Sequence, residues 1–60
     1  MKIELYEKGS GNPLEIIADI EAAKIETIGA EIQILNLLTI SGKRKAREID
    51  SSRIDLLFKA

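Results

Sequence analysis

The sequence predicts a mainly α fold: a short N-terminal β-strand, one long helix with two apolar faces and a short C-terminal helix, assembled as a helix-packed homo-oligomer. Three observations predict it. The chain has 60 residues without cysteine or histidine, Asn12 and Pro13 form a helix-start pattern, and apolar residues then recur every three or four positions as far as residue 40. We interpret residues 1–60 as a single small oligomerising domain.

The first expected element is a strand over residues 2–6. Ile3 and Leu5 alternate with Glu4, which is the period of a strand with one buried face. Gly9 and Gly11 then end regular structure. Residues 7–12 are therefore expected to form a loop.

The long helix is expected over residues 13–40. Asn12 suits the N-cap, Pro13 the first turn, and Glu15 follows the cap by three residues. Residues spaced alternately by four and three give one apolar face, expected at the oligomer interface: Ile16, Ile20, Ala23, Thr27, Ala30, Ile34 and Leu37. A second stripe lies nearly opposite: Leu14, Ile17, Ile25, Ile28, Ile32 and Leu35. One chain this short cannot cover both stripes, which predicts self-association. In the alternative interpretation the helix breaks near Gly29 and its halves pack on each other.

The basic tail, residues 43–60, is expected to end in a helix in which Ile54, Leu57 and Phe58 share a face. The alternative is a strand in which Ile54, Leu56 and Phe58 alternate and which pairs with residues 2–6. A strand followed by two helices resembles the ribbon-helix-helix repressors in architecture, with Glu4 and Glu7 where that strand would carry base-reading side chains. We assign no family from this order of elements.

Composition argues against several classes of function. No run approaches the roughly 20 apolar residues that span a bilayer, no secretory leader opens the chain, and the absence of cysteine fits a reducing compartment; we expect a cytoplasmic protein. Without cysteine or histidine the usual nucleophile and general base are missing, so we expect no enzyme. No calcium-loop spacing occurs, and we expect neither metal nor cofactor.

Two segments are candidate anion sites. The loop Lys8, Gly9, Ser10, Gly11 and Asn12 combines flexible backbone N–H groups, a lysine and the start of the expected helix, although it also suits a simple capped turn. The tail contributes Lys43, Arg44, Lys45, Arg47 and Arg53, whose charges attract phosphates or dock on the acidic body of another subunit.

These features predict a non-catalytic, homo-oligomeric binding protein. It occupies a partner protein or sequesters an anionic, nucleotide-like small molecule, as a phage or mobile-element accessory protein would. The alternative is a small dimeric DNA-binding transcriptional regulator that uses the basic segment 43–47. The slightly acidic net charge of -1 makes nucleic acid the less favoured partner.

Overall fold

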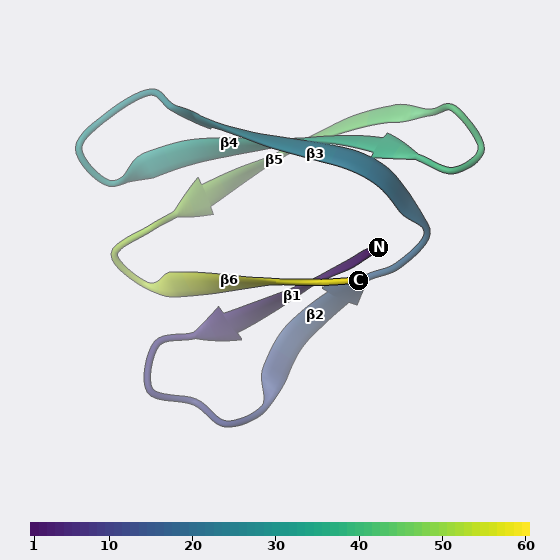
Figure 1. Ribbon diagram of the computed structural model, residues 1–60. Coiled ribbons are helices and arrows are strands. Elements are labelled where there is room, and N and C mark those ends of the chain that lie inside the picture. The colour runs from purple at the N-terminus through teal and green to yellow at the C-terminus, as the bar shows by residue number, and fades with distance from the viewer.

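The computed structural model describes residues 1–60 and consists of six β-strands without a helix (Figure 1). The strands are β1 (Lys2–Glu7), β2 (Pro13–Ile17), β3 (Ile20–Thr27), β4 (Ile32–Thr39), β5 (Arg44–Asp50) and β6 (Ile54–Lys59). They form two three-stranded antiparallel sheets. Sheet A has the order β2-β1-β6 and sheet B the order β3-β4-β5.

The two sheets form two layers joined by two short links (Figure 1). Residues 18–19 lead from β2 into β3, and residues 51–53 lead from β5 into β6. The first link turns through Asp19, whose φ of 59° lies in the left-handed region, where aspartate is one of the few tolerated non-glycine residues. The remaining connections are hairpins within one sheet, so the chain crosses between layers only twice.

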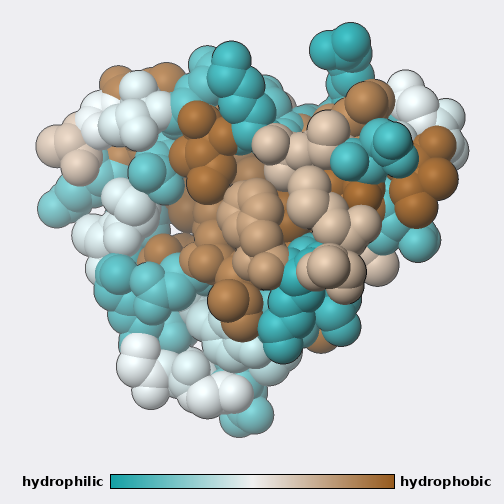
Figure 2. All heavy atoms as spheres, viewed as in Figure 1, coloured by the Kyte–Doolittle hydropathy of each residue, from teal (hydrophilic) through white to brown (hydrophobic).

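The core lies between the layers and is small. Ile3 and Leu5 come from sheet A, and Ile20, Leu35, Leu37 and Ile49 come from sheet B. Ile17, Ala23, Ile54 and Leu56 are partly buried against this cluster. Figure 2, in the same view as Figure 1, shows apolar residues gathered between the layers with hydrophilic residues largely around them.

The prediction of a mainly α fold is wrong, because residues 13–40 form β2, β3 and β4. The spacing of apolar residues by three and four suggested a helix because β4 carries apolar residues on both faces. Leu35 and Leu37 point into the core, while Ile34 and Leu38 lie on the opposite face. Alternation of period two is hidden in such a strand. β-branched isoleucines, which favour strands, are frequent throughout this segment.

The helix-start pattern has another role here. Pro13 is the first residue of β2, which is an edge strand. Proline is tolerated at such a position because no backbone N–H is needed there to bond a neighbouring strand. Asn12 donates its backbone N–H to Ser10 Oγ (3.2 Å) within the loop. Gly29 lies in the turn between β3 and β4, so the chain does break there, but between strands.

The predicted helix-packing face does not form, and its residues are spread over both sheets. Ile20 and Leu37 are in the core, Ala23 packs against it, Ile16 is exposed on β2, Thr27 ends β3, Ala30 lies in the following turn and Ile34 is on β4. The expected helix-packed homo-oligomer therefore has no helix on which to assemble.

The predicted C-terminal helix is also wrong. Residues 54–59 form β6, which pairs antiparallel with β1 from Lys2↔Lys59 to Glu7↔Ile54, as in the strand alternative. The order of elements of the ribbon-helix-helix repressors is consequently absent. The structure contains no helix long and apolar enough to cross a bilayer.

The depth of the core leads to a first prediction. Ile3 is fully buried, whereas Ile40, in the β4–β5 turn, is 62% exposed. Ile3→Val should lower the free energy of unfolding by about 0.5–1.5 kcal/mol, the usual cost of removing one buried methylene. Ile40→Val, the same chemical change at the surface, should leave it within about 0.5 kcal/mol of the parent. Urea denaturation measures both, and equal effects would contradict the packing described.

Candidate anion-binding site

The structure separates the two candidate anion-binding segments. The Lys8 backbone N–H donates to the Arg53 carbonyl (2.9 Å), so the loop of residues 8–12 and Arg53 lie together. Lys43 and Arg44 lie at the other end of β5, which has seven residues and spans about 20 Å. A compact ligand therefore cannot contact both sets.

The loop of residues 8–12 closes the β1–β2 hairpin. Ser10 N–H donates to the Glu7 carbonyl (2.9 Å), and Gly9 adopts a φ of 83°, which requires glycine. The Lys8 ammonium group donates to Asp55 Oδ1 (2.8 Å). Because β2 follows the loop, no helix N-terminus adds positive potential.

Arg47 is bound within the chain. Its guanidinium donates to both carboxylate oxygens of Glu15, each at 2.8 Å, and so links β5 of sheet B to β2 of sheet A. The Arg47 hydrogen bonds hold the pKa of Glu15 below its ordinary value, while Glu15 raises the pKa of Arg47. This bidentate pair connects the layers and leaves Arg47 unable to bind a ligand unless the bridge opens.

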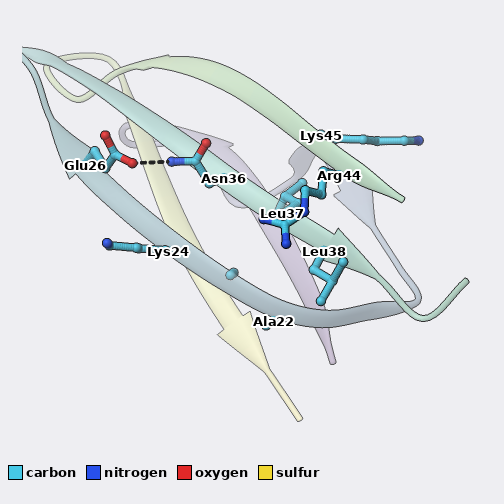
Figure 3. A pocket seen from close by; sticks show the side chains of 9 residues that line it. Ala22, Lys24, Glu26, Asn36, Leu37, Leu38, Arg44 and Lys45 are labelled. Carbon is cyan, nitrogen blue, oxygen red and sulfur yellow. Dashed lines mark hydrogen bonds between the residues drawn. The ribbon is translucent and has the colours of Figure 1, made fainter. Parts of the chain in front are cut away.

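A shallow hollow of about 430 Å³ lies on the face of sheet B that points away from sheet A. Side chains alternate across a strand, so Asn36 and Leu38 face outward where Leu35 and Leu37 face the core. The residues around the hollow are Ala22, Ala23, Lys24, Glu26, Asn36, Leu37, Leu38, Arg44 and Lys45 (Figure 3). Volumes of this order are common for small-molecule sites.

Arg44 is the central charged group of this hollow. In Figure 3 its side chain turns toward Leu38 in the middle of the hollow, whereas Lys24 and Lys45 extend toward opposite sides of the view. Asn36 Nδ2 donates to Glu26 Oε1 (2.9 Å) on the rim. Salt bridges within the chain engage Lys2, Lys8, Arg47 and Lys59, which leaves Arg44, Lys24 and Lys45 available to an anion.

The hollow thus combines residues that the sequence singled out with others that it did not. Arg44 and Lys45 belong to the predicted basic segment, whereas Lys24 and Asn36 lie outside both predicted anion-binding segments. The register β3–β4–β5 places Lys24 opposite Asn36 and Asn36 opposite Ala46. Only a strand interpretation of residues 20–50 could have brought them together.

A second polar cluster surrounds Glu4 on the outer face of sheet A. The Glu4 side chain is only 7% exposed and lies near the ammonium groups of Lys59 (3.4 Å) and Lys2 (3.9 Å). The Tyr6 hydroxyl donates to Glu4 Oε1 (2.9 Å). The spacing of two residues puts Lys2, Glu4 and Tyr6 on one face of a strand, so this cluster could have been found from the sequence.

The Glu4 cluster is internally satisfied. The Tyr6 hydrogen bond, with the charges of Lys59 and Lys2, lowers the pKa of Glu4 against the opposing effect of burial, and Glu4 raises the pKa of Tyr6. No buried polar side-chain atom lacks a hydrogen-bond partner, and no three acidic side chains converge as a metal site would require. We assign the cluster a structural role.

Comparison with protein-family models, with curated proteins and with solved structures finds no match to this chain. The hollow on sheet B is therefore the feature of this chain from which we infer a function.

The acidic groups predict how stability depends on pH. The pKa values of Glu4, Glu15 and Asp50 are lowered in the folded chain, for Asp50 by hydrogen bonds from Ser52. The unfolded chain then binds more protons in acid, so the free energy of unfolding should be steady above about pH 5 and fall as the pH drops through about 4. Urea denaturation between about pH 3 and 7 measures this dependence.

Glu4→Gln should reduce the loss of stability on acidification, because one of the three carboxylates is then removed. Glu21→Gln, at an exposed position without an ion pair, is the matched control and should retain the parent's profile. An unchanged acid dependence in Glu4→Gln would contradict the role given to this cluster.

Proposed function

We propose that this protein is a non-catalytic binding protein that holds an anionic, nucleotide-like small molecule in the hollow on the outer face of sheet B. The observation that carries the proposal is the Arg44 side chain, which has no ion pair or hydrogen bond within the chain and turns over the middle of the hollow. A guanidinium group offers paired N–H donors that match the oxygens of a phosphate.

The surroundings of Arg44 favour a ligand with both a charged and an apolar part. Ala22 and Leu38 give the hollow apolar surface, and Lys24 and Lys45 add positive charge at its margins. Glu26, the one acidic residue there, accepts a hydrogen bond from Asn36. A phosphate would pair with Arg44 while a base or other ring lies against Leu38, the division of roles common in small-molecule sites.

Duplex DNA is the second candidate, favoured by the consecutive charges of Lys43, Arg44 and Lys45 where β5 begins. A regulator that contacts several phosphates would lose affinity steeply with salt, with a logarithmic slope of roughly -0.9 per phosphate neutralised. A single nucleotide has fewer charges and no comparable counterion layer, so its affinity should fall less. The cytoplasmic location inferred from the sequence is kept as part of this proposal.

The test is a thermal-shift and calorimetric titration with ATP, GTP and inorganic phosphate. A nucleotide at a hundred times its dissociation constant should stabilise the folded chain by about 2.7 kcal/mol. Arg44→Ala should weaken binding by about tenfold or more, because hydrogen bonds to charged groups contribute about 1.5–3 kcal/mol.

The matched control is Arg53→Ala, which removes the same charge from an exposed position at the other end of β5. It should leave nucleotide affinity unchanged. Equal losses in the two variants would mean that net charge alone attracts the ligand. The absence of any shift with these anions, together with salt-sensitive binding of a short DNA duplex, would replace the proposal with the regulator.

A further inference from the structure

β3 presents an open sheet edge over most of its length. Its only strand partner is β4. At its start the edge is closed by Met1: the Ile20 N–H donates to the Met1 carbonyl (2.9 Å), and the Met1 ammonium group donates to the Ile20 carbonyl (2.7 Å). A register shift at Glu21 follows, and Lys24 to Thr27 are all exposed.

The hydrogen bonds of the two hairpins show which backbone groups of β3 face this edge. Thr39 N–H donates to the Lys43 carbonyl (2.8 Å), so the odd-numbered residues of β4 bond to β5. Ile28 N–H donates to the Ile32 carbonyl (3.0 Å), so the even-numbered residues bond to β3. In this register Ala23, Ile25 and Thr27 direct their N–H and C=O groups outward, away from β4.

The other three edges carry features that oppose pairing with a second copy. β2 has only five residues, begins with Pro13 and is bulged at Leu14. On β5, every two-fold antiparallel register sets at least one pair of like charges opposite each other, since Arg44, Lys45, Arg47, Glu48 and Asp50 occupy most of the strand. On β6, Asp55 and Lys59 already pair with Lys8 and Glu4.

We infer that two copies of this chain pair antiparallel along β3, with the two-fold axis at Ile25. Only residues that direct their backbone groups outward can exchange hydrogen bonds, and an axis at Ile25 pairs Ile25 with its own copy and Ala23 with Thr27. It also sets Lys24 opposite Glu26 of the other copy, twice. An axis at residue 24 would set Lys24 opposite Lys24 of the other copy, and an axis at residue 26 would set Glu26 opposite Glu26. Like charges directly opposite each other are unfavourable.

Pairing in this register covers Ile25, which is 40% exposed in the single chain, and satisfies the outward N–H and C=O groups of β3. Sheet B, with three strands, becomes half of a continuous six-stranded sheet. The two-fold axis is perpendicular to this sheet, so both hollows open on the same face. The sequence predicted self-association along a helix face. The interface inferred here is instead the edge of β3, and it includes Ala23 and Thr27.

The experiment measures mass by analytical ultracentrifugation. The parent protein should sediment at twice 6.6 kDa at about 100 µM, where a micromolar dissociation constant populates the dimer. Lys24→Glu and Glu26→Lys each turn both cross-strand pairs repulsive, and each should raise the dissociation constant by about tenfold or more. Glu48→Lys, the same charge change on β5, should leave it unchanged.

Mixing the two reversed variants gives the decisive result. When a Lys24→Glu chain faces a Glu26→Lys chain, both cross-strand pairs are attractive again, so the heterodimer should have a dissociation constant about tenfold or more below that of either variant alone. Circular dichroism of each variant alone confirms that it is folded. A monomeric parent at about 100 µM, a dissociation constant that neither reversal raises, or a mixture that associates no more tightly than either variant alone would each overturn the inference. Arg44→Ala should not alter the dimer, so this result is independent of nucleotide binding.

Discussion

The contact on which the rest of the molecule depends is that of Ile3 and Leu5 with the inner face of sheet B. Neither layer has more than three strands, and a small isolated sheet needs a covered apolar face to be stable in water. Since only six hydrophobic side chains are buried, each contributes a large share of the stability. The Arg47–Glu15 bridge and the Met1–Ile20 hydrogen bonds hold the layers together at the margins of this contact.

The hollow and the open edge of β3 are neighbouring features of sheet B, in which β3 is an edge strand. Sheet A covers only one face of sheet B, so the polar residues of β3 and β4 and the basic residues at the start of β5 remain accessible on the other. Lys24 and Glu26 take part in both features: they lie on the rim of the hollow and next to the free edge. Their opposite charges cancel within each chain, so the positive character of the hollow comes from Arg44 and Lys45 whether or not the edge is paired.

The sequence predicted local features better than long-range ones. The alternation at Ile3, Glu4 and Leu5 pointed to a strand where β1 lies, but the apolar residues on both faces of β4 concealed the same alternation farther along the chain. Asn12 and Pro13 suit an edge strand as well as a helix start.

In the site, the sequence predicted Arg44 and Lys45, which line the hollow. It also predicted Lys8 and Arg47, but these two side chains bind Asp55 and Glu15, partners 47 and 32 residues away. Such pairings follow from topology, which short-range patterns do not contain.

The position of β1 between β2 and β6 determines the order in which the layers can be completed. Sheet B is a meander of consecutive strands, so its pairings close short loops and need no residue outside 20–50. Sheet A pairs β1 with β6, and Ile3 meets Phe58 only when the whole segment between these two residues is present. During synthesis, when the N-terminal part of a chain emerges first, β1 and β2 remain a lone hairpin until residues 54–59 arrive.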